Sequence, residues 1–169
     1  MAIRDLRNID INLYDFVTSG LRSHCYEILS GYGVPYVASG IYVVDGYPED
    51  FETLKAPSLS IEHDQSRQEP FQIGPGKQNI RRFAINIYAR SDGERDDLGE
   101  LVYNFFDSTM TIYDKNQFFQ NGTMVNIGTA DFDNIIMRSQ RDTRFKSLKH
   151  QMNISFEAEI IVPTGNSLV

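Results

Sequence analysis

The spacing of apolar residues predicts an amphipathic helix from Asp10 to Ser30. Apolar side chains recur there at every third or fourth position, which places them on one face of a helix. These residues are Leu13, Phe16, Val17, Leu21, Cys25 and Ile28. Asp10 suits the N-cap position, and Gly31 and Pro35 follow as residues that end helices.

A second helix is predicted to begin at Ser91. Ser91 and Glu94 have the spacing of a capping box, and acidic residues fill the first turns, where the helix dipole favours negative charge. The predicted buried stripe consists of Leu98, Leu101, Val102, Phe105 and Thr109.

Three strands are predicted between these helices, at 41–44, 57–62 and 82–89. In segment 57–62, Leu59 and Ile61 face one way and polar residues face the other, which is typical of a half-buried strand. The second and third strands are expected to form a hairpin. The strand at 41–44 is rich in β-branched residues and ends at a turn.

The connection within this hairpin, from His63 to Lys77, is polar and much longer than the common two to five residues. It is predicted to be a loop that carries Phe71 and Ile73 beside the turn at Gly74. Either these apolar side chains reach an exposed tip, or they fold back onto the body of the protein.

The last third of the chain is predicted to be β-structure. Asn121-Gly122 is typical of a two-residue hairpin turn, and 132–137 is predicted to be a strand. The segment 152–162 alternates throughout and should form a strand of roughly 40 Å at about 3.3 Å per residue.

This order of elements predicts an α+β fold, with a mostly antiparallel sheet, two amphipathic helices packed on one face and a long projecting β-hairpin. We expect one domain over residues 1–169, with an ordered core at about 10–163 and short N- and C-terminal arms. Projecting strands expose edges that a partner or protective charges must cover.

Composition narrows the possible partners. The 169 residues include 23 acids and 16 bases, and the net charge of −7 opposes general affinity for nucleic acid or an anionic membrane. No apolar run is long enough to span a membrane, and none follows the N-terminus as in a signal peptide. Cys25 is the only cysteine, which indicates a reducing compartment.

Candidate chemistry is sparse. The chain has no phosphate-binding glycine motif, and its histidines are far apart in sequence. Cys25 is expected to be a small buried apolar residue. Glu62, His63 and Asp64 lie together at a strand end, where a small metal-dependent nuclease could hold a cation, although a solvated strand end explains them better. We therefore expect no catalytic residue, metal or cofactor, and no enzyme.

Charged residues form two clusters. The basic cluster contains Arg138, Arg141, Arg144, Lys146 and Lys149, and the acidic cluster contains Asp92, Glu94, Asp96, Asp97 and Glu100. The basic cluster is a solvated loop, a subunit contact or a phosphate contact. We hypothesise that copies of the chain pair one cluster with the other, because a head-to-tail interface joins two different surfaces.

Four stretches resemble the tail-terminator proteins of long-tailed bacteriophages. They are the helix at 10–30, the strand Pro57-Ser58-Leu59-Ser60-Ile61, the polar hairpin into Arg82-Phe83-Ala84-Ile85-Asn86-Ile87-Tyr88, and the helix at 98–106 that leads to a long closing strand. Related neck and tail-completion proteins share this pattern. The segment 118–127 has no clear place in it.

The resemblance implies a structural virion protein that assembles in the host cytoplasm. Its copies would form a hexameric ring that caps the head-proximal end of the tail tube and binds the tail tube protein and the head–tail connector or stopper. DNA would pass through without sequence-specific binding. The expected contact residues are Gln68, Phe71, Ile73, Gly74, Lys77, Arg81, Asp96, Asp97, Arg138, Arg141, Arg144 and Lys146.

Overall fold

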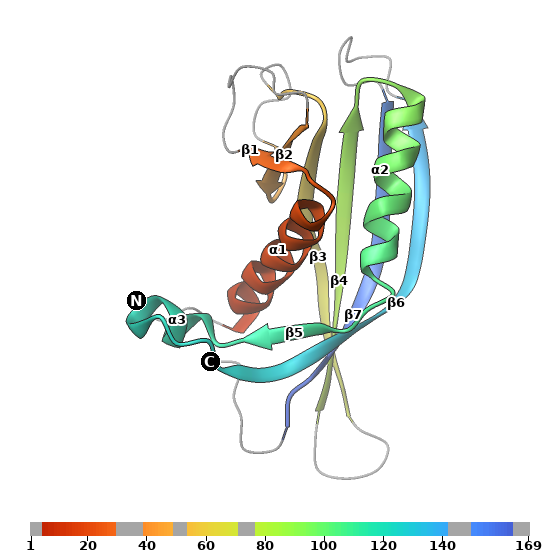
Figure 1. The fold of residues 1–169 in the computed structure, drawn as a ribbon. Helices are drawn as coiled ribbons and strands as arrows, with labels where there is room; N and C mark the ends of the chain where they lie inside the picture. Colours follow the sequence, from red (N-terminus) through yellow and green to blue (C-terminus); the bar gives the residue numbers. More distant parts are fainter. Residues whose placement is uncertain (1–4, 30–38, 49–53, 71–76, 142–149, 164–169) are drawn as a thin grey trace.

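The computed structural model describes residues 5–29, 39–48, 54–70, 77–141 and 150–163 (Figure 1). These residues form an α+β fold with one sheet, as the sequence predicts. In chain order the elements are α1 (Asp5–Ser23), β1 (Glu27–Leu29), β2 (Gly40–Asp45), β3 (Ser58–Pro70), β4 (Lys77–Ala89), α2 (Asp92–Phe105), β5 (Met110–Tyr113), α3 (Lys115–Asn121), β6 (Asn126–Arg141) and β7 (His150–Ile161).

The seven strands are ordered β1-β2-β3-β4-β7-β6-β5 in the sheet. The pairs β1–β2 and β2–β3 are parallel. All other neighbouring pairs are antiparallel, so the expectation of a mostly antiparallel sheet is confirmed. Figure 1 shows that the sheet is strongly curled, with β5 and the beginning of β6 bending away from the upper ends of β4 and β7.

The main core lies on one face of the sheet, which we call the inner face. Alternate residues of β3, β4 and β7 point into it, and the apolar sides of α1 and α2 belong to the same cluster. Gly99 allows α2 to pack closely on β7, because a Cβ atom there would collide with the Met152 side chain. Among the aromatic contacts, the ring centroids of Phe106 and Phe156 are 4.2 Å apart.

Helix α1 corrects the predicted bounds of the first helix. It begins at Asp5 and ends at Ser23, so Asp10 is not its N-cap. Cys25 has a φ of 64°, and the Tyr26 and Cys25 amides donate to the carbonyls of Leu21 and Arg22, which completes a Schellman ending. Cys25 is therefore exposed rather than buried, and the residues after it form strand β1.

Helix α3 replaces a predicted hairpin turn. Asn121 ends the helix, and Gly122 follows it with a φ of 74° and donates its amide to the carbonyl of Phe118 over 2.8 Å. A left-handed glycine serves both a helix end and a two-residue hairpin turn, so the dipeptide alone did not distinguish them.

The long polar connection predicted at 63–77 is mostly β-structure. Strand β3 continues to Pro70 and β4 starts at Lys77, with an antiparallel register from Ser58 opposite Tyr88 to Pro70 opposite Lys77. Only 71–76, which contains the predicted apolar tip, lies outside the described residues. The first part of β3 is buried on both sides, since Ser58 and Ser60 are also fully buried.

Candidate assembly surfaces

The outer half of strand β6 has a free edge. β6 pairs with β7 up to Arg141 opposite His150, whereas its pairing with β5 stops at Ala130. Within the described chain, no strand pairs with the other side of residues 131–141, and Figure 1 shows this part of β6 at the rim of the sheet. Alternate backbone N–H and C=O groups of an edge strand point outward without a sheet partner.

Apolar side chains are exposed along the same edge. Ile136 is 46% exposed and Met137 is 44% exposed, and because they are consecutive in a strand they lie on opposite faces. A bulge precedes them between Asp133 and Ile136, where Asn134 has a φ of 52° and donates its side-chain amide to Glu157. The bulge bends the strand locally, and the pairing with β7 is regular again from Ile136 to Arg141.

Strand β3 provides a second free edge on the opposite side of the sheet. β2 pairs with β3 only from Ser58 to Ile61, and the Gly46 amide donates to the Ile61 carbonyl at the end of this pairing. From Glu62 to Pro70, β3 pairs with β4 alone among the described strands. The register shift next to His63 bends this edge locally.

The face of the sheet opposite the helices, which we call the outer face, is polar and hollowed. A trough of about 770 Å³ runs across β4, β7 and β6, with Ala84 and Ser155 among its smaller lining residues. Arg82 and Glu157 form an ion pair of 2.7 Å beside it. Arg138 also lines the trough and is exposed, and it forms no ion pair with the described residues.

A hydrogen-bonded row crosses the upper part of the outer face. Glu62 accepts hydrogen bonds from Ser60 over 3.0 Å and from the Asn86 amide over 2.7 Å, and Asn153 donates to Asn86 over 2.7 Å. Burial raises the pKa of the neighbouring Tyr88 to about 12, although its hydrogen bond with Ser60 acts in the opposite direction. Glu62 is thus held in a fixed position near the β3 edge.

This geometry does not support the nuclease alternative. Glu62 and His63 are consecutive in β3 and face opposite sides of the sheet, and the His63 ring lies 5.6 Å from Phe83. Asp64 falls within the register shift between His63 and Gln65. In the part of the chain that the structure describes, no three His, Cys, Asp or Glu side chains are grouped so that they could hold a metal ion.

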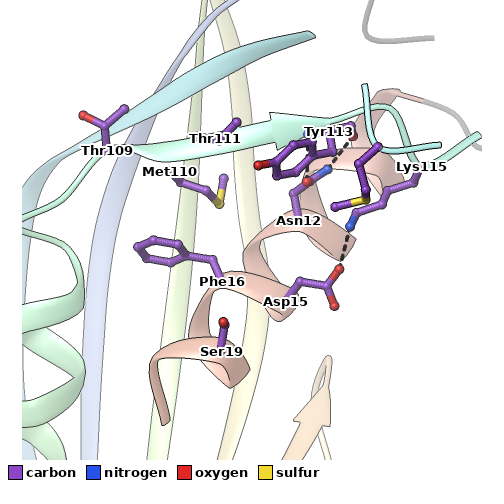
Figure 2. Close-up of a pocket in the computed structure, with 10 residues that line it drawn as sticks. Asn12, Asp15, Phe16, Ser19, Thr109, Met110, Thr111, Tyr113 and Lys115 are labelled. Carbon is purple, nitrogen blue, oxygen red and sulfur yellow. Dashed lines mark hydrogen bonds and ion pairs between the residues drawn. The ribbon is translucent and has the colours of Figure 1, made fainter. Parts of the chain in front are cut away.

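A smaller pocket of about 360 Å³ lies between α1 and β5 (Figure 2). The Asn12 side chain occupies the free edge of β5 there: its amide nitrogen donates to the Tyr113 carbonyl and its oxygen accepts from the Tyr113 amide, over 2.9 and 3.0 Å. The buried Lys115 ammonium reaches Asp15 at 2.6 Å, and Figure 2 shows both on the same side of the pocket. The edge of β5 is therefore partly covered within the chain.

A second exposed apolar cluster lies on and after α3. Phe118 is 38%, Phe119 64% and Met124 49% exposed, and the two phenylalanine rings meet edge to face. The hairpin turn predicted at Asn121-Gly122 implied a strand before it, whereas the phenylalanines lie in α3. Their amphipathic pattern is too short to distinguish a seven-residue helix from a strand.

Only some of the predicted contact residues lie on the surface of the chain. Arg81 is 2% exposed and pairs with Asp10 of α1 at 3.1 Å, so its side chain is buried inside the subunit. Burial raises the Asp10 pKa and lowers the Arg81 pKa, and the attraction between the two opposes both shifts. Asp96 and Asp97 are exposed on α2.

The other predicted contacts lie at strand ends or outside the described chain. Gln68 and Lys77 are on the ribbon formed by β3 and β4, and Arg141 ends β6. Residues outside the described chain are Phe71, Ile73, Gly74, Arg144 and Lys146. Their role between subunits stays a prediction.

The first turn of α2 contacts the beginning of β7. His150, which pairs with Arg141 in the sheet, binds Asp92 of α2 at 2.9 Å. Arg95 contacts both Asp92 and Asp96. Part of the acidic charge is therefore balanced within the chain, and a pairing of these clusters between copies also stays a prediction.

The N-terminus of α2 is held by its N-cap residue, Ser91. Ser91 accepts a hydrogen bond from the Glu94 amide over 3.2 Å, as the sequence predicts. The Glu94 carboxylate binds the backbone and guanidinium of Arg90 rather than the Ser91 amide. Burial acts to raise the Glu94 pKa, but the hydrogen bonds from Arg90 outweigh it and hold the pKa below its ordinary value.

Comparisons with known proteins add little. No protein-family profile matches the chain, and no curated protein matches it by sequence. Among solved structures it is similar to a chain in a structure described as the virion of a native gene transfer agent particle, with a TM-score of 0.38 and 12% identity over 70% of this chain and 77% of that one. No helix among the described residues is long and apolar enough to cross a membrane.

Proposed function

We propose that this protein is a structural subunit of a virion tail, and that its copies join side by side through the free edges of their sheets. The proposal rests on the edge of β6 at 131–141, where backbone groups that no described strand pairs occur together with the half-exposed Ile136 and Met137. A neighbouring chain would bury these apolar groups and pair the backbone in one step.

The finer proposal is a tail terminator: a hexameric ring that caps the head-proximal end of the tail tube and joins it to the neck. The order of the elements supports it, since the opening helix, the hairpin, the second helix and the long closing strand all have the positions that the resemblance implies. The ring would bind the tail tube protein on one side and the connector or stopper on the other. This role needs no cofactor and no catalysis.

The ribbon of β3 and β4 is the proposed contact along the tail axis. Figure 1 shows this ribbon extending past the ends of α1 and α2. The predicted contact residues Gln68 and Lys77 lie on this far part, opposite Asn79 and Pro70. The net charge of −7 suits a ring through which DNA moves without adhering.

Light scattering after size-exclusion chromatography, with negative-stain microscopy, tests this function. The protein is examined alone and after addition of purified tail tubes, because ring formation can require the tube as a template. We expect closed rings that bind one end of each tube. Rings that do not bind tubes but bind the connector would instead identify a connector or tail-completion protein. A chain that stays monomeric in both conditions would contradict the proposal.

A further inference from the structure

We infer that the partner of the β6 edge is the β3 edge of a second copy of this chain, joined as antiparallel strands. This inference rests on the proposed function and specifies the contact through which the ring would form. The two edges are residues 131–141 of β6 and 62–70 of β3, and they lie on opposite sides of the central strands β4 and β7.

Strand direction favours this pairing. β3 is antiparallel to β4, β4 to β7, and β7 to β6, so β3 and β7 run one way while β4 and β6 run the other. Copies in a cyclic ring share one orientation relative to the ring axis. The β6 strand of one copy would therefore meet the β3 strand of the next with opposite direction, and the alternation would continue across the interface.

The heights of the two edges also match. Following the register across the sheet, Ile136 is level with Ser155, Ala84 and Glu62. In the same way Asp131 of β6 is level with Arg67 of β3. Residues 131–136 and 62–67 thus occupy the same height, so copies that stand level in a ring place one free edge against the other.

Side chains on the outer face are complementary at this height. Ile136 of one copy would lie opposite Glu62 of the next, where its exposed surface would be covered. Arg138, two residues along the strand on the same face, is level with Ser60, where β2 covers the β3 edge, so its long side chain would reach back diagonally to that Glu62. Arg138 has no carboxylate partner within the described residues, and Glu62 is held near the edge by Ser60 and Asn86.

The contact explains why one chain has two unlike edges. Each copy would present β6 on one side and β3 on the other, which is a heterologous interface that closes into a ring. Closure would pair 131–136 of each β6 with 62–67 of the next β3, whereas a twofold β6–β6 contact would leave the whole β3 edge without a strand partner. The inferred contact therefore accounts for both edges at once.

Cysteine cross-linking tests this contact directly. In a Cys25→Ser background, one chain carries Ile136→Cys and another carries Glu62→Cys, and the two are mixed under ring-forming conditions with a short bismaleimide. We expect covalent dimers in the mixture and little product from either chain alone. A chain with both substitutions should give a ladder of oligomers. A chain with Ile136→Cys and Ile161→Cys is the control, because Ile161 is 40% exposed but lies away from both edges.

The outcomes separate this inference from the proposed function. Dimers formed by the Ile136→Cys chain alone would show a twofold β6–β6 contact and overturn the inference. Rings seen by light scattering without any cross-link between the two positions would also overturn it, while leaving the structural role intact. The absence of rings, alone and on tail tubes, would contradict the structural role itself.

Discussion

Replacing the two exposed apolar residues of the β6 edge with lysine should weaken assembly without unfolding the subunit. Full burial of an Ile or Met side chain is worth about 1.5–3 kcal/mol. Ile136 and Met137 are 46% and 44% exposed, so assembly can still bury a little under half of each. That corresponds to roughly 0.7–1.4 kcal/mol per residue and about 1.5–3 kcal/mol for the pair.

These energies predict that Ile136→Lys/Met137→Lys raises the dissociation constant of each subunit contact roughly ten- to a hundredfold. Lysine at position 137 should add to this, because burying its charge opposes strand pairing. Lysine at position 136 would lie opposite Glu62 of the next copy, and this opposite-charge pair should offset part of the loss. Sedimentation velocity over a dilution series measures the effect, with a urea melt to show that the subunit stays folded. Ile161→Lys is the matched control. If the double variant assembles at the same concentration as the wild type and the control, the reasoning is wrong.

Three further substitutions test the subunit itself. Gly128→Ala should lower the free energy of unfolding by about 1–3 kcal/mol, because the added Cβ would lie 2.5 Å from a backbone oxygen of β7. Gly93→Ala in α2 has open space around it and should raise the free energy of unfolding by about 0.5 kcal/mol. Urea melts of the two variants measure both changes. Asp10→Asn removes the carboxylate that the buried Arg81 guanidinium contacts and should lower the free energy of unfolding by about 1.5–3 kcal/mol. Arg81→Met removes the buried charge itself and should cost less, and equal losses would contradict this reasoning. Glu94→Gln should lower the free energy of unfolding by about 0.5–1 kcal/mol above pH 4.5. This difference from the wild type should vanish as the pH falls through the lowered pKa of the Glu94 carboxylate in the folded protein. Urea melts at pH 7 and pH 3 measure it.

Alternating patterns located the strands well but not their ends. The closing strand was predicted at 152–162 and is β7. The pattern fails where a strand leaves the core, because neither face is then buried and no alternation is selected. For this reason the ends of β3 and β4 were read as a loop, and β6 was predicted only at 132–137.

Helical periodicity was reliable only where tertiary packing agreed with it. Cys25 and Ile28 continue the apolar spacing of α1, yet the chain turns at Cys25 and Ile28 enters β1. Two apolar residues three positions apart, such as Cys25 and Ile28, are compatible with a helix and also with a turn that is followed by a short strand. The start of the helix was missed because Asn8 is polar, although it is buried and accepts a hydrogen bond from the Lys115 amide.

The surfaces were less predictable than the fold. Arg81 was expected at an interface because an arginine in a polar segment is usually exposed, and only the position of α1 shows that it pairs with Asp10. The β6 edge at Ile136 and Met137 was missed for the same kind of reason. Exposure there depends on where β5 stops pairing, which is a property of the whole sheet.

Hydrogen exchange of the backbone amides tests most directly whether copies of the chain cover the free edges. Peptides that span 62–67 and 131–136 are compared between dissociated protein and assembled rings, with a peptide from β7 as an internal reference that is already protected. Assembly is predicted to slow exchange in both edge segments and to leave the reference unchanged. Intact rings in which both segments exchange as fast as in the free subunit would contradict the account.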